Sequence, residues 1–297
     1  HRKGIVVAMS GGIDSSAVAA LAVSAVGPER VHGLMLPEHD SSGDSLRLAT
    51  ILAEKLGIGF DVVDIGPALE AMGCYRYRNE AIREVFPDFE EDWKSKIVLP
   101  PLGEKARLNV YSLVVQKPDG SIEKKRLPLK PYLQLVAATN MKQRTRKATE
   151  YFHADRLNYA VSGTPNRLEY DQGFFVKGGD GLADLKPIAH LYKTQVYAMA
   201  EHLGVPDEIC KRPPTTDTYS MPQSQEEFYF ALPYDLMDLC LYAHNHGVPA
   251  EEVAEAAGLN ADQVRFVFKD IDVKRRTTRY LHMTPRVVEP IGEIHPD

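Results

Sequence analysis

The chain has 297 residues, enough for one large domain or for one domain with an appended piece, and its formal net charge of −6 disfavours nucleic acid as a partner. It contains no apolar run of membrane-spanning length and no visible signal peptide, which predicts a soluble, cytoplasmic protein without membrane contact. The three cysteines, Cys74, Cys210 and Cys240, form no CxxC pair, which argues against a disulfide framework and a structural zinc site.

The first elements alternate between strands and helices. Residues 4–9 form a short apolar run typical of a buried parallel strand, and residues 17–26 are apolar densely enough for a packed helix. Residues 31–36 and 60–65 predict two more strands, with an amphipathic helix over residues 45–58 between them. This order predicts an α/β fold with a doubly wound, mostly parallel sheet flanked by helices.

The turn after the first strand, residues 10–16, reads SGGIDSS. Its two glycines allow backbone angles and a close approach that side chains would prevent, and the free amides at the start of the following helix attract anions. The turn therefore predicts a phosphate site. Helix capping by its aspartate and serines is an equally good explanation on the turn alone.

A later strand over residues 157–163 ends in another polar turn. Ligands of parallel α/β sheets bind at the carboxyl ends of the strands. The turns at Ser10, Pro37 and Gly163 are therefore expected to face one crevice.

Residues 74–135 interrupt this pattern. Apolar and polar residues alternate on both sides of Pro118–Gly120, which predicts an inserted β-hairpin. A surface hairpin is the simplest interpretation, and a lid or a dimer contact is the alternative.

The turn SGGIDSS resembles the SGGxDS loop of the ATP pyrophosphatases, and further motifs resemble NAD synthetase. Together with the loop, these motifs extend over about two thirds of the chain. Each motif alone is a weak signal, but a chance match of all of them in this order is a poor explanation. The resemblance implies a Rossmann-like ATP pyrophosphatase fold in a single domain over 1–297, which includes the 74–135 insertion and a C-terminal helical segment over 218–297. The matching stretches are NMKQRTR (140–146), SGTPNRLE (162–169), FFVKGGDGLADLKPI (174–188), LYKTQV (191–196) and RPPTTD (212–217).

The same resemblance implies a reaction and its partners. In this family ATP adenylates the carboxylate of nicotinic acid adenine dinucleotide, pyrophosphate leaves, and ammonia displaces AMP to form NAD. Mg²⁺ is the implied cofactor, and the family is usually a homodimer. Glutamine use needs a separate amidase with a nucleophilic cysteine that a base activates. Of the three thiols only Cys210 lies beside basic residues, and it has no evident histidine partner nearby in the sequence. Ammonia is therefore the expected nitrogen source, and a separate amidase is a possible partner.

Roles for individual residues are also implied by the resemblance. Asp14, Lys193 and Glu169 are the expected catalytic residues, and Asp14 and Glu169 the expected Mg²⁺ ligands. The expected ATP-binding residues are Ser10, Gly11, Gly12, Asp14, Ser15, Ser16, Thr164, Lys193 and Thr215. The expected dinucleotide-binding residues are Arg144, Lys177, Asp184, Lys274 and Arg275.

Simpler interpretations exist for several of these residues. Arg144 lies in a predicted helix whose charges could form a solvated face, Lys193 could be an ordinary helix start, and Thr215 follows two prolines and could belong to a turn. The chain also departs from the family pattern at Lys142, Pro165 and Val273, all expected on the dinucleotide side. Another amide-forming ATP pyrophosphatase that acts on a different carboxylate therefore stays open, as does a non-catalytic nucleotide-binding module.

Overall fold

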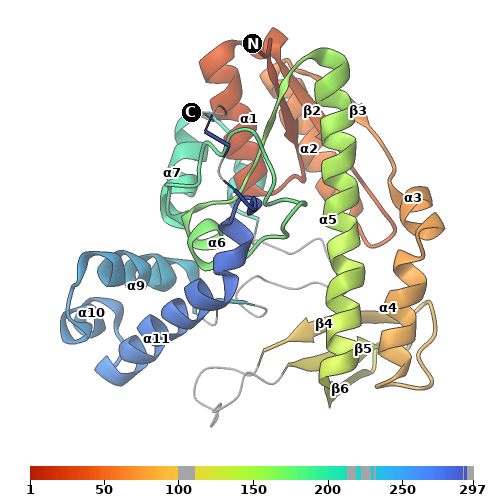
Figure 1. The fold of residues 1–297 in the computed structure, drawn as a ribbon, viewed down its shortest axis with the longest axis vertical. Coiled ribbons are helices and arrows are strands. Elements are labelled where there is room, and N and C mark those ends of the chain that lie inside the picture. Colours follow the sequence, from red (N-terminus) through yellow and green to blue (C-terminus); the bar gives the residue numbers. More distant parts are fainter. Residues whose placement is uncertain (100–110, 213–218, 222–228, 231, 290, 293–297) are drawn as a thin grey trace.

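A four-stranded parallel sheet, in the order β3-β2-β1-β7, forms one end of the molecule (Figure 1). The computed structural model describes all residues except 100–110, 213–218, 222–228, 231, 290 and 293–297. The predicted parallel sheet is confirmed. Its strands are β1 (Ile5–Ala8), β2 (Val31–Met35), β3 (Gly59–Val62) and β7 (Ala160–Ser162).

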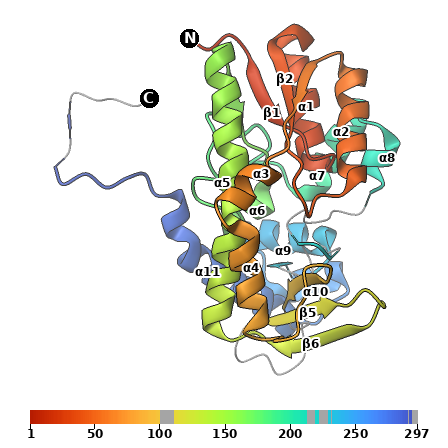
Figure 2. The same cartoon turned by 90° about the vertical axis from the view of Figure 1, so that its right-hand side faces the viewer.

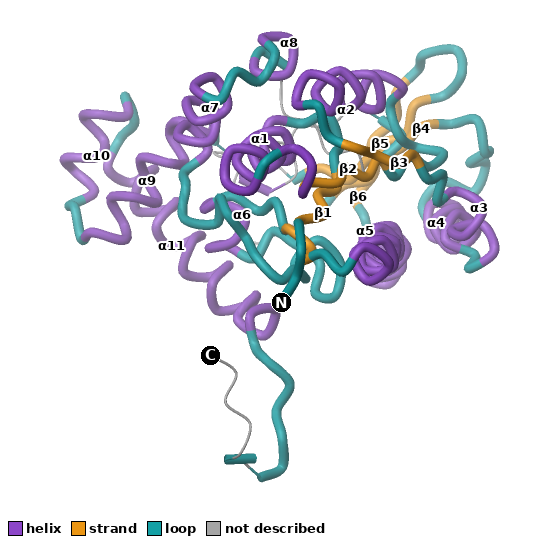
Figure 3. Tube along the Cα trace, turned by 90° about the horizontal axis from the view of Figure 1, so that it is seen from above, coloured by secondary structure: helices purple, strands orange, loops and turns teal. Residues whose placement is uncertain are grey.

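Helices cover both faces of this sheet (Figure 3). Neighbouring residues of a strand point to opposite faces. Val7 therefore packs in the core shared with α1 and α2, whereas Val6 packs in the core shared with α3, α4 and α5. Burial on both faces explains why the first strand is a continuous apolar run rather than an alternating one. The helices are α1 (Ile13–Val26), α2 (Gly43–Leu56), α3 (Gly66–Ala71), α4 (Cys74–Arg83) and α5 (Leu129–Leu157).

The insertion contains the predicted hairpin and one more strand. β5 (Ser112–Gln116) pairs antiparallel with β6 (Ile122–Arg126), and Gly120 adopts a φ of 85° in the connecting turn. β4 (Lys94–Val98) pairs with the other edge of β5 and was not predicted. Leu113 and Val115 are buried against α4 and α5, so the hairpin is part of a packed core rather than a free surface loop.

One long helix connects the two ends of the molecule. α5 has 29 residues and runs from the small antiparallel sheet to the large parallel one (Figure 2). Among the described residues, α5 and the other helices are all too short or too polar to cross a bilayer.

The C-terminal half adds helices beside the sheet. α7 (Lys193–His202) and α8 (Asp207–Cys210) extend the core on the α1 side. A separate hydrophobic core is formed by Leu168 of α6 and by residues of α9, α10 and α11. These last three helices make up most of the described part of the predicted C-terminal helical segment. The remaining helices are α6 (Arg167–Gln172), α9 (Tyr234–His246), α10 (Ala250–Ala257) and α11 (Ala261–Thr278).

Candidate active site

A cavity of about 730 Å³ opens at the carboxyl edge of the parallel sheet. Ser10, Pro37 and Gly163, which follow three different strands, all line it, so the predicted common crevice is confirmed. The volume lies in the range usual for sites that bind small molecules.

The turn after β1 leaves the start of α1 open to this cavity. Gly11 has a φ of 73°, and a Cβ at this position would lie 2.4 Å from the Ser45 carbonyl oxygen, so only glycine fits. Gly12 is the N-cap residue of α1, and no side chain caps it. Ser15 instead accepts a hydrogen bond from the Ser10 amide and donates one to the Gly12 carbonyl. The serine is thus bonded within the turn, which favours the phosphate site over helix capping.

Two carboxylates and one ammonium group lie beside this turn. The Lys193 Nζ lies 2.5 Å from Asp14 Oδ2, and the lysine side chain is fully buried. Asn166 joins the two acids, because its side-chain amide donates to Asp14 Oδ1 over 3.1 Å and its backbone N–H donates to Glu169 Oε2 over 3.1 Å. Glu169 and Asn166 also form a capping box at the start of α6, which fixes the glutamate at the cavity wall.

The formal charges of Asp14, Glu169 and Lys193 sum to one negative charge. Burial alone would lower the pKa of Lys193, but the charges of Asp14 and Glu169 outweigh burial and raise it. The ammonium group therefore stays charged. The hydrogen bond from Lys193 to Asp14 leaves further lone pairs on the Asp14 carboxylate. Both acids line the cavity. Such hard oxygen donors beside the predicted phosphate-binding turn fit a Mg²⁺ ion.

Arg144 and Lys177 lie together on another wall of the cavity. The Arg144 Nε donates to the Lys177 carbonyl oxygen over 3.2 Å. Lys177 Nζ in turn donates to the carbonyl oxygens of Tyr280 and Met283, which ties the C-terminal residues to the loop after α6. Thr164 also lines the cavity. The structure therefore brings these three predicted site residues to the same space as Asp14.

Asp184, Lys274, Arg275 and Ser16 do not line the cavity. Asp184 accepts hydrogen bonds from the Val161 amide and the Tyr151 hydroxyl, so it anchors a loop to β7. Lys274 is bonded to the Tyr229 carbonyl and to Asp270, and Arg275 makes a bidentate pair with Asp171. Ser16 is buried in α1, and Gly11 packs against the Ser45 carbonyl and does not line the cavity either.

Thr215, another predicted ATP-binding residue, lies outside the described residues. The basic neighbours of Cys210 do not lower the pKa of its thiol. Burial raises its pKa, and Glu201 and Asp207 raise it further. Burial also raises the pKa of the Cys240 thiol, to about 11.

Sequence reasoning missed part of the cavity wall. Tyr111 and Tyr132 stack with ring centroids 4.6 Å apart and line the cavity from the insertion and α5. Lys147 and Glu150, a buried pair 2.5 Å apart, line it as well. Burial raises the pKa of Glu150. The lysine and glutamate are spaced three apart on α5 and could have been found as a helix pair, whereas the tyrosines gave no local signal.

The fold and the site define a nucleotide-binding α/β enzyme of the ATP pyrophosphatase class. The sequence model of the NAD synthase family matches residues 1–96 and 102–279. The chain belongs to the NAD synthase family, whose members are ATP-dependent amide-forming ligases.

Curated relatives and solved structures agree with this assignment. The NH(3)-dependent NAD(+) synthetase of Mesorhizobium japonicum is 62% identical over 99% of this chain and 92% of its own length. The protein of the same name from Rhizobium meliloti is 60% identical over 99% of this chain and 88% of its own. An NMN synthetase from Francisella tularensis has a similar fold, with a TM-score of 0.63 at 22% identity over 96% of this chain and 89% of its own.

Proposed function

We propose that the protein is an ammonia-dependent NAD synthetase. The observation that carries this proposal is the placement of Asp14, Glu169 and Lys193 beside an uncapped helix start, in a cavity that also contains Arg144 and Lys177. The curated relatives at 60–62% identity that carry this name support it.

In the first step a carboxylate oxygen of nicotinic acid adenine dinucleotide attacks the α-phosphorus of ATP. The bond from that phosphorus to pyrophosphate breaks, and a mixed anhydride with AMP forms. The turn from Ser10 to Ser15 holds the leaving pyrophosphate through the amides of α1. Asp14 and Glu169 are the residues that would hold Mg²⁺, which shields phosphate charge when bound. Lys193 does not line the cavity, so it acts as a positioning residue that fixes Asp14.

In the second step the nitrogen of ammonia attacks the activated carbonyl carbon. The bond from that carbon to the AMP oxygen breaks, and the nitrogen loses a proton as the amide forms. The protein's main contribution is to position the reactants, and Arg144 and Lys177 attract the phosphates of the dinucleotide. Arg275 holds Asp171 of α6 and so supports the helix that carries Glu169.

Two of the three departures from the family pattern lie away from this cavity. Lys142 is 2% exposed and bonded to Glu38 and Asp40 away from the lining, and Val273 does not line the cavity either. Only Pro165 of the three departures lies on its wall. This placement favours the family's dinucleotide over a different carboxylate.

A homodimer and a cytoplasmic location complete the proposal. Leu129 and Leu133 are 70% and 55% exposed one turn apart on α5, which gives a second copy an apolar surface. The cysteines are free, as in proteins of a reducing compartment.

The nitrogen source separates this function from a glutamine-dependent one. We expect the purified chain to form its amide with ammonium salts, faster as pH rises and free NH₃ increases, and to show negligible turnover with glutamine freed of ammonia. The described thiols lack the lowered pKa that an amidase nucleophile needs. A glutamine rate equal to the ammonium rate, retained after replacement of all three cysteines, would contradict the proposal. Glutamine turnover only after a second protein is added would identify a separate amidase as its partner.

A further inference from the structure

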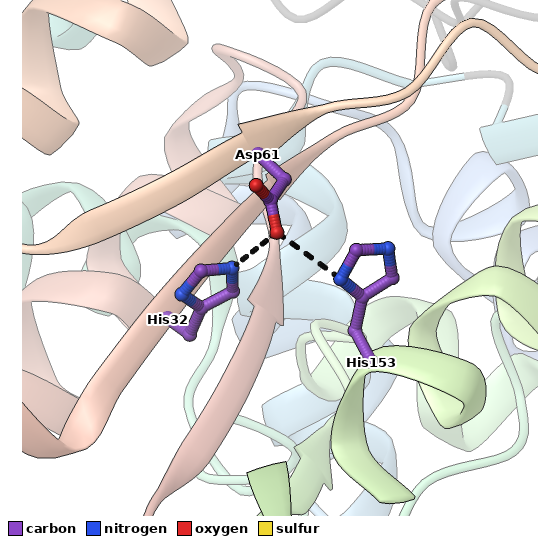
Figure 4. Close-up of side chains that lie close together, drawn as sticks. All are labelled: His32, Asp61 and His153. Atoms are coloured by element: carbon purple, nitrogen blue, oxygen red, sulfur yellow. Dashed lines mark hydrogen bonds and ion pairs between the residues drawn. The ribbon is translucent and has the colours of Figure 1, made fainter. Parts of the chain in front are cut away.

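A second group of ligand-bearing side chains lies on the face of the parallel sheet that α5 covers (Figure 4). His32 comes from β2, Asp61 from β3 and His153 from the C-terminal part of α5. These three residues do not line the active-site cavity. The mechanism proposed above gives them no role.

Their ligand atoms converge on one point. His32 Nε2 lies 3.0 Å from Asp61 Oδ2, and His153 Nδ1 lies 3.2 Å from the same oxygen. All three atoms lie within 4.8 Å of one another. The His153 side chain is 9% exposed and that of Asp61 is 41% exposed, so the group is held by the fold on one side and reached from water on the other.

The guanidinium group of Arg156 lies beside these ligand atoms. Its Nη2 donates to Asp61 Oδ2 and, over 2.8 Å, to His153 Nδ1. A guanidinium group only donates hydrogen bonds, so His153 Nδ1 accepts and carries a lone pair directed into the group. Arg156 has a long side chain that is 41% exposed, and it can turn outward into solvent.

We propose that His32, Asp61 and His153 form a Zn²⁺ site that the guanidinium group of Arg156 occupies when the metal is absent. Two imidazole nitrogens and one carboxylate oxygen are a donor set that Zn²⁺ prefers over Mg²⁺, and water can complete a four-coordinate site. A bound ion links β2, β3 and α5. It therefore stabilises the folded chain without entering the reaction.

The test is a Zn²⁺ titration of the full chain in competition with a chromogenic chelator, without ATP and with Mg²⁺ in excess. We expect one saturable ion per chain, a higher Tm with Zn²⁺, and loss of both in His153→Gln and in Asp61→Asn. Because Asp61 is partly exposed, its variant keeps the test valid if the histidine variant is unstable. His244→Gln is the matched control: His244 lies 2.8 Å from Asp272 in a pair with a single histidine, so its replacement is expected to leave binding unchanged.

Arg156→Gln gives the sharper result. Removal of the competing cation is expected to tighten Zn²⁺ binding by about 10- to 100-fold, since hydrogen bonds between charged groups must otherwise be broken first. Pyrophosphate release is expected to stay unchanged, because Arg156 does not line the cavity. The absence of saturable binding, or binding that survives Asp61→Asn, overturns the site. Unchanged or weaker binding in Arg156→Gln overturns the competition assigned to Arg156.

Discussion

Replacing Glu169 by Gln is expected to lower pyrophosphate release by at least about 10²- to 10³-fold while the Tm stays nearly constant. The variant removes one negative charge from the cavity wall and keeps the shape of the side chain. Glutamine also serves in a capping box, so the N-terminus of α6 keeps its bond from the Asn166 amide. Loss of activity at constant Tm would therefore report the charge and not the fold.

Asp14→Asn tests the second acid of the same site and is expected to show a loss of similar size. Its Tm is also expected to fall, because Lys193 would then be a buried charge without its carboxylate partner. Asp207→Asn is the control, since Asp207 is an acid at the start of a helix whose side chain is 83% exposed. Normal turnover of either active-site variant at saturating Mg²⁺ would show that the metal assignment is wrong.

Replacing Lys142 by Met is expected to cost about 3–5 kcal/mol in the free energy of unfolding. The ammonium group lies 3.0 Å from Glu38 and 2.5 Å from Asp40, and the side chain of Glu38 is fully buried. Burial alone would raise the pKa of Asp40, but Lys142 and Arg78 outweigh it and lower this pKa, so the acid is charged at pH 7. Methionine leaves two carboxylates near each other without their shared cation.

Urea unfolding at pH 7 measures this cost. Lys130→Met is the matched control on the same helix, because Lys130 is 80% exposed and pairs with Glu84 at the surface, so its midpoint is expected to change little. Equal midpoints for the two variants would show that the buried pair contributes no more than a surface one.

The parallel sheet could be predicted because its local signals agree with one another. Each local pattern indicates the structure of its own segment: the apolar run predicts β1, the glycines at 11 and 12 predict the turn after it, and polar residues predict the turn after β7. The carboxyl ends of parallel strands share one edge of the sheet, which places these turns together. The same rule placed Asp14 and Glu169 on one wall.

Other parts of the molecule depend on contacts between distant residues. β4 has only one apolar position that packs fully, Ile97, and it becomes a strand because β5 offers an edge. Lys142 was expected on the dinucleotide side, yet it faces Glu38 and Asp40, which precede it by about a hundred positions. Its role could not be predicted because no local pattern indicates a partner at that distance.

The acceptor carboxylate tests the central claim most directly. With Mg-ATP and ammonium present, pyrophosphate release is measured for nicotinic acid adenine dinucleotide, nicotinic acid mononucleotide and nicotinic acid. The proposed function predicts a kcat/KM for the dinucleotide at least about 100-fold above the other two, because only the dinucleotide carries the pair of phosphates that Arg144 and Lys177 attract. One AMP and one pyrophosphate are expected per NAD formed. Faster release with either smaller carboxylate, or release without amide formation, would contradict it.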